Sequence, residues 1–230
     1  MNEFLQDSMF FGLLLSLAAY LIGSWLHKKT RSGLANPLLI AILLTIAVLL
    51  VGDIDYDTYN NSAKYLSYLL TPATVCLAAP LYRQLEKLRD SLPAILAGVF
   101  AGSLAGLVSV LLFSKLLGFT RAEYVTFLPK SITSAIGLSV SEELGGYPSL
   151  TVAVIILSGV LGNISCGAFL KLLRIKDPVA KGTAIGTASH AIGTSKALEI
   201  GELEGAVSSL SIVIAGILTV LLATLFAGLY

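Results

Sequence analysis

Long apolar stretches recur along the chain and set the strongest limit on its fold. Only 13% of the 230 residues are charged, against about 25% in a typical soluble domain. Stretches of about 18 or more apolar residues indicate transmembrane helices, and lipid accepts only helices or closed barrels. Because these stretches do not alternate as strands would, we predict an all-α polytopic membrane protein, a single integral domain over residues 1–230. The candidate membrane segments are 8–26, 36–51, 62–81, 93–117, 124–140, 149–173, 182–200 and 206–226.

Two of these segments, 124–140 and 182–200, are short and crowded with Ser, Thr and Gly. We expect the chain to be a multi-pass protein of the plasma membrane. Because basic loops prefer the cytoplasmic side, we predict that loops 27–35, 83–90 and 171–181 are cytoplasmic. An even number of crossings must then separate the last two loops, although three segments lie between them. We therefore expect about six full crossings plus two polar segments, each either re-entrant or a broken helix.

Short motifs repeat at one spacing. The motif "SAIG" at 134–137 returns as "HAIG" at 190–193, and "SKLL" at 114–117 returns as "LKLL" at 170–173, both 56 positions later. We interpret 91–146 and 147–203 as inverted repeats, preceded by the N-terminal helices 1–90 and followed by a last helix over 206–230. Inverted repeats with interrupted helices that meet near the bilayer midplane are typical of transporters.

The two polar segments carry the residues that could bind a substrate. Pro129 interrupts a helix, and the hydroxyls and lysine that follow it suit an anion near a helix start. Intramembrane ionisable residues such as His190 are functional candidates, for orienting a substrate or coupling a proton. The candidate substrate-binding residues are Lys130, Ser131, Thr133, Ser134, Asn163, Thr187, Ser189, His190, Thr194 and Ser195, and the candidate structural breaks are Pro129, Gly137, Gly186 and Gly193.

Simpler interpretations of the same residues stay open. Small residues also let membrane helices pack closely, and Lys130 could extend to the membrane surface instead of binding a substrate. His190 could pair with a backbone carbonyl, and Asn163 could satisfy the backbone of an interrupted segment. We expect the acidic side chains near the segment ends, including Glu202 and Glu204, to lie in water.

Other classes of function find little support in the sequence. The net charge of +1 shows no nucleic-acid footprint. The two histidines, His27 and His190, are far apart and show no metal-ligand spacing, and no phosphate-binding loop is present. Ser189 and His190 are adjacent in sequence, which does not make a catalytic pair. We therefore expect neither an enzyme nor a cofactor.

The stretches "FLPKSITSAIGLSVSEELGGYPSLT" and "LKLLRIKDPVAKGTAIGTASHAIGTSKALEIGELEGAVSSLSIVIAGILT" resemble the LrgB/CidB family, and "NPLLIAILLTI" and "TPATVCLAAPLYRQL" extend the resemblance over essentially the whole chain. It implies one of two functions. Some relatives are antiholin-like and modulate murein hydrolase activity and autolysis. Others resemble carriers of small monocarboxylates, as does the LrgB-like part of the plastid glycolate/glycerate translocator.

The resemblance implies an LrgA/CidA-like small membrane protein as partner. Together with the polar segments, it predicts a transporter subunit that moves pyruvate, lactate, glycolate or glycerate by alternating access. The alternative is an antiholin-like regulator of cell-wall hydrolysis. Neither the coupling ion nor homo-oligomer formation follows from the sequence.

Overall fold

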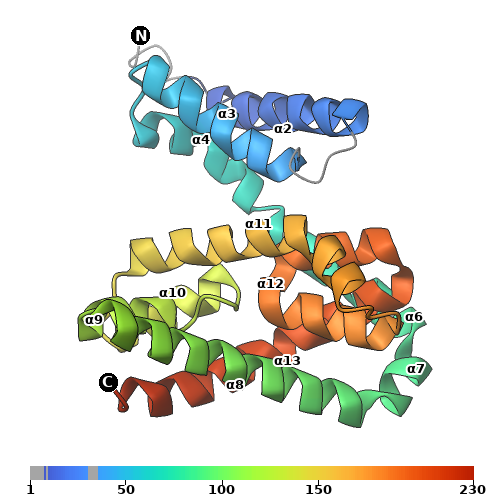
Figure 1. Cartoon of the computed structure of the whole chain (residues 1–230). Helices are drawn as coiled ribbons and strands as arrows, with labels where there is room; N and C mark the ends of the chain where they lie inside the picture. The colour runs from blue at the N-terminus through green and yellow to red at the C-terminus, as the bar shows by residue number, and fades with distance from the viewer. Residues whose placement is uncertain (1–7, 9, 31–35) are drawn as a thin grey trace. The chain divides into compact units, whose positions relative to one another are not determined.

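Figure 1 shows a computed structural model of the chain, in which residue 8, residues 10–30 and residues 36–230 are described. The chain divides into two compact units, Met1–Cys76 and Leu77–Tyr230, and the single integral membrane domain over residues 1–230 stays a prediction. Each unit has its own set of packed helices.

The first unit is a small group of helices packed around the N-terminal apolar segment. The backbone N–H of Gly12 donates to Ser62 Oγ at 2.7 Å, which joins the helix over Phe11–Thr30 to the helix over Tyr56–Ser67. The basic residues predicted for loop 27–35 begin inside a helix, because His27, Lys28 and Lys29 occupy its last turn, and 31–35 lie outside the described residues. The helices are α2 (Phe11–Thr30), α3 (Pro37–Val51), α4 (Tyr56–Ser67) and α5 (Leu70–Cys76).

Three long helices form the frame of the second unit. α8 (Leu92–Leu117) and α13 (Glu202–Ala227) run in the same direction. Ile95 packs with Val207 near the start of both helices, and Val110 packs with Ala223 near their ends. Two short helices precede the frame. The frame helices are α8 (Leu92–Leu117), α11 (Pro148–Leu172) and α13 (Glu202–Ala227), and the short ones are α6 (Ala78–Arg83) and α7 (Leu85–Asp90).

The polar segment 124–140 forms two short helices with a loop between them. The first begins at a capping box, in which the Thr120 hydroxyl accepts from the Glu123 N–H and the Glu123 carboxylate accepts from the Thr120 N–H at 2.7 Å. The helix ends at Phe127, two residues before the buried Pro129, which has no N–H to continue the hydrogen-bond pattern. The two helices are α9 (Arg121–Phe127) and α10 (Ser134–Glu143).

This segment starts and finishes at the same end of the frame (Figure 1). Near the start of α11, Thr126 Oγ1 accepts from the Tyr147 N–H at 2.8 Å. α10 runs antiparallel to α11, because Ser141 Oγ accepts from Thr151 Oγ1 at 2.6 Å and Gly137 faces Ile155, four residues further into α11. Loop 128–133 therefore reaches inward from the end where α8 stops, and α10 returns to that end.

The second polar segment, α12 (Pro178–Ile200), is a pair of helical arms that meet at His190. His190 has φ 41° and ψ −142°, a region that residues with a side chain rarely adopt. The arm over 178–189 runs antiparallel to α11, as the contact of Ile185 with Leu170 shows. The arm over 191–200 runs back.

The return of the second arm follows from its contacts. Asn163 Nδ2, in the middle of α11, donates to the carbonyl of Ile192 at 2.7 Å. Ile200, at the end of the arm, lines a pocket with Lys171 near the end of α11. The two polar segments thus enter the frame from opposite ends, whereas the inverted repeat remains a prediction.

Five stretches of the described residues are long and apolar enough to cross a membrane, and α3 is a shorter apolar helix. Many large apolar side chains on these helices are exposed, as lipid-facing residues would be. The chain is therefore a polytopic α-helical membrane protein, while the exact number of crossings and the side that each loop faces stay predictions. The stretches are Phe11–Thr30, Tyr56–Arg83, Leu92–Leu117, Pro148–Leu172 and Glu202–Ala227.

Candidate functional site

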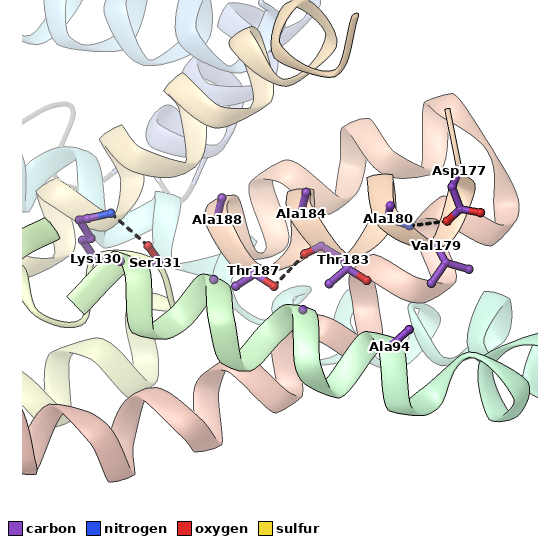
Figure 2. A pocket seen from close by; sticks show the side chains of 13 residues that line it. Ala94, Lys130, Ser131, Asp177, Val179, Ala180, Thr183, Ala184, Thr187 and Ala188 are labelled. Carbon is purple, nitrogen blue, oxygen red and sulfur yellow. Dashed lines mark hydrogen bonds between the residues drawn. The ribbon is translucent and has the colours of Figure 1, made fainter. Parts of the chain in front are cut away.

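A cavity of about 570 Å³ lies between α8, loop 128–133 and the first arm of α12. Figure 2 shows Lys130 and Ser131 at one end of it and Asp177 at the other. Most of the wall consists of glycine, alanine and threonine. The lining residues are Ala94, Gly98, Gly102, Gly106, Lys130, Ser131, Asp177, Val179, Ala180, Thr183, Ala184, Thr187 and Ala188.

Three glycines at four-residue spacing form the α8 side of this cavity, and we call them the glycine stripe: Gly98, Gly102 and Gly106. A Cβ on Gly98 would lie 2.9 Å from the Thr183 Cγ2, and one on Gly102 would lie 2.9 Å from the Thr187 Cγ2. A Cβ on Gly106 would meet nothing within 4 Å. The two threonine methyls therefore fill the first two positions, and the cavity is open at the third.

Lys130 and Ser131 supply the polar end of the cavity. Lys130 Nζ donates to Ser131 Oγ at 3.3 Å, and both side chains are half-buried. Of the described residues that line the cavity, Lys130 alone is cationic. Asp177, at the other end, caps α12 by accepting from the Ala180 N–H at 2.8 Å. At the end away from Asp177, a cation beside a hydroxyl is an arrangement that suits one carboxylate.

Three of the predicted site residues come together around this cavity: Lys130, Ser131 and Thr187. The Thr187 hydroxyl donates to the Thr183 carbonyl at 2.7 Å, so its proton is already used inside the helix. The remaining predicted residues do not line the cavity, and these are Thr133, Ser134, Asn163, Ser189, His190, Thr194 and Ser195.

His190 is held against α11. Its ring Nε2 lies 3.0 Å from the carbonyl oxygen of Ile155, and the residue is only 3% exposed. Gly159 makes this approach feasible, because a Cβ there would lie 2.7 Å from the same ring nitrogen. The backbone pairing that the sequence left open is therefore the contact that His190 makes, and it fixes the point where the two arms meet.

The other predicted polar residues hold the two arms of α12 against α11 and α13. Thr194 Oγ1 lies 2.7 Å from Ser208 Oγ on α13 and donates to the carbonyl of His190 at 3.0 Å. Asn163 donates to Ser195 Oγ at 3.2 Å, in addition to its bond to α12 backbone. Ser189 is buried and packs against Gly162 of α11.

The predicted breaks have different roles. Pro129 lies where α9 ends, as expected, and Gly137 gives close packing of α10 on Ile155. Thr133 is the N-cap of α10, although its side chain makes no capping hydrogen bond, and Ser134 is the first residue of that helix.

The interruption in α12 falls at His190, and not at the glycines on either side. Gly186 lies inside the first arm and faces Ser208 of α13, whereas Gly193 lies inside the second arm and faces Ser189 of the first. Both glycines therefore allow close packing of the helices and do not interrupt them.

Two residues near the site were missed or misplaced from the sequence. Glu204 was expected in water, but it is 8% exposed and lies 3.7 Å from Lys181. Thr183 was not selected, although two Gly-Thr pairs at 182–183 and 186–187 are four residues apart and so share a helix face. That spacing was the available signal.

The long apolar helices and the two polar segments that enter from opposite ends define a multi-pass helical membrane protein. The chain belongs to the LrgB-like family, whose pattern matches residues 16–229, as the resemblance predicted. It is similar to the antiholin-like protein LrgB of Bacillus mycoides (strain KBAB4), Bacillus cereus (strain B4264) and Bacillus anthracis (strain CDC 684 / NRRL 3495). Each is 38% identical over 218 residues, which cover 94% of this chain and 95% of the relative. No solved structure matches the chain.

Proposed function

We propose that this chain is a transporter subunit that moves small monocarboxylates across the cell membrane, together with an LrgA-type partner. The substrate class is that of pyruvate, lactate, glycolate and glycerate. The proposal rests above all on the cavity at the end of loop 128–133, where a single cation and a hydroxyl face the open third position of the glycine stripe.

The chemistry of the cavity supports a small anion as substrate. The Lys130 ammonium attracts the carboxylate, and Ser131, which accepts from that ammonium, keeps its own proton for a second hydrogen bond. The wall at Gly106 and Ala188 has room for a few heavy atoms and offers no further charge. A larger or more highly charged anion would bury charge without a partner, which costs free energy.

Two polar segments that start from opposite ends of a frame also support alternating access. The loop with Lys130 and the first arm of α12 border the same cavity but are attached at different ends. Movement of either segment against the frame would change which end of the cavity is open. His190 lies outside the cavity, so in this proposal it positions the first arm and does not contact substrate.

Uptake of labelled pyruvate into proteoliposomes that contain the chain, with and without an LrgA-type partner, tests the proposal. We expect Lys130→Ala to abolish saturable uptake and Lys130→Arg to retain part of it. The matched control is Lys115→Ala, which removes an exposed lysine from the last turn of α8. Unchanged saturable uptake in folded Lys130→Ala protein would contradict the site, and a linear, non-saturable flux would contradict a carrier.

A second candidate function is antiholin-like, as the name of the similar Bacillus proteins suggests, and the family resemblance implies that such a protein regulates murein hydrolase activity. A regulator of that kind acts through helix surfaces that contact partner proteins. The variant Lys130→Ala distinguishes the two functions when lysis and pyruvate uptake are both measured. The transport role predicts loss of uptake, whereas the regulatory role predicts wild-type lysis rates and no uptake that depends on Lys130.

A further inference from the structure

A second pocket, of about 460 Å³, lies at the turn between α11 and α12 and is strongly basic. Four cationic side chains line it: Lys171, Arg174, Lys176 and Lys181. No acidic side chain lines it among the described residues. Four cations around one pocket create a positive potential that favours an anionic ligand.

The chain itself neutralises only part of this charge. Lys181 lies 3.7 Å from Glu204, which is the one ion pair made by the four. In the described part of the chain, Lys171, Arg174 and Lys176 make no ion pair. Three cations are therefore available to a ligand.

Arg174 occupies a backbone conformation that usually belongs to glycine. α11 ends in a Schellman motif, in which the Arg174 N–H donates to Lys171 O at 3.1 Å and the Ile175 N–H donates to Leu170 O at 2.9 Å. The residue in the left-handed position of this motif has φ 53° and is an arginine. At the equivalent position after α10 the chain has Gly145, with φ 81°. An arginine is strained where glycine is not, so Arg174 costs the turn some stability that a glycine would restore.

Apolar surface adjoins the cations. Leu170, Ile175 and Ile200 form the apolar part of the pocket lining. Leu172, the last residue of α11, and Leu173, its C-cap, are 75% and 64% exposed. A ligand that satisfies both surfaces has an anionic head and apolar chains.

We propose that this pocket binds the phosphate of an anionic phospholipid, with the cations of the α11–α12 turn around the phosphate and the acyl chains along the exposed leucines. Basic pockets between membrane helices commonly bind such headgroups. The pocket contains the end of α11 and both ends of α12, so a bound lipid would hold the base of the two arms. The proposal does not depend on whether the chain transports a monocarboxylate.

Native mass spectrometry of the full chain, purified in detergent and titrated with lipid, tests this site. We expect phosphatidylglycerol to bind at least tenfold more tightly than phosphatidylcholine. Glycerol 3-phosphate and inorganic phosphate serve as headgroup-only probes, and we expect them to bind more weakly than the lipid. Equal binding of the two lipids would overturn the proposal, and inorganic phosphate that binds as tightly as the lipid would overturn the lipid as ligand.

The left-handed position provides a variant that separates binding from folding. Arg174→Gly removes the cation and relieves the turn, so we expect unchanged or higher thermal stability and about tenfold weaker phosphatidylglycerol binding, the loss of roughly one charge-assisted hydrogen bond. Lys28→Gln with Lys29→Gln, which removes charge from α2, is the control and should leave binding unchanged. Full phosphatidylglycerol affinity in folded Arg174→Gly protein would overturn the site.

Discussion

Substitution of the glycine stripe tests how α8 and α12 pack, and Gly102 gives the sharpest case. A Cβ added at Gly102 would lie 2.9 Å from the Thr187 Cγ2, well inside van der Waals contact. Overpacking of this kind costs about 1–3 kcal/mol. Alanine gains about 1 kcal/mol over glycine inside a helix. We therefore expect Gly102→Ala to be destabilised by about 0–2 kcal/mol.

Thr187→Ser removes the methyl that causes the overlap and keeps the hydroxyl that donates to the Thr183 carbonyl. In the double variant the overlap is gone, so the two substitutions should couple favourably by about 1–3 kcal/mol in a double-mutant cycle. Gly106→Ala is the matched control, because its added Cβ meets nothing within 4 Å. We expect it to be as stable as the wild type or slightly more stable.

Thermal unfolding in detergent, followed by the fraction of protein that remains monodisperse, measures these differences. For chains of this size, 1 kcal/mol corresponds to a shift of about 2–4 °C in Tm. Two results would refute the packing described here. One is a Gly102→Ala variant as stable as Gly106→Ala, and the other is a double variant with no recovery over Gly102→Ala alone.

Three further predictions concern neighbouring sites. His190→Gly should be more stable than His190→Ala by about 1 kcal/mol, since both lose the bond to the Ile155 carbonyl but glycine alone accepts the positive φ; the opposite order of Tm values would contradict the strain. The N–H and hydroxyl of Thr120 hold the pKa of Glu123 below its usual range, so these bonds stabilise the fold above the normal glutamate range and lose that contribution as the pH falls through the lowered pKa. Thr120→Ala removes the hydroxyl bond to the Glu123 carboxylate and also the cap on the Glu123 N–H, so it should lower Tm more at neutral pH than in strong acid, and an equal loss at both pH values would contradict this. Gly106→Leu should fill the open end of the cavity and block pyruvate uptake while Tm is retained, and normal uptake would contradict the position of the site.

The helical membrane class could be predicted from the sequence because apolar length is a local property. α8, α11 and α13 begin and end close to the predicted segments. Pro93 and Gly118 mark the two ends of α8, and Pro148 marks the start of α11. Segment 62–81, in contrast, is divided among α4, α5 and α6. Nothing in its hydropathy indicated where the chain would bend.

The site was predicted less completely, for a physical reason. Lys130 and Ser131 were selected because a polar pair after a proline stands out in an apolar chain. His190 and Thr194 stand out equally, but their polar atoms bond to Ile155 and Ser208. Whether a buried polar group serves a ligand or the fold depends on partners far away in sequence, and residue type alone does not decide it.

The glycine stripe has three equivalent positions on α8, and the methyl groups of Thr183 and Thr187 in the first arm of α12 pack against two of them. The two helices run in the same direction with the same four-residue repeat. A translation of the arm by four residues, about 6 Å, would place Thr183 against Gly102 and Thr187 against Gly106 with the same methyl-to-glycine contacts. The free volume would then move from one end of the stripe to the other. The stripe itself therefore accepts two registers, and the contacts of the arm with Ile155 and Ser208 are what hold it in the register seen here. Cysteines at 106 and 187 would cross-link only in the second register.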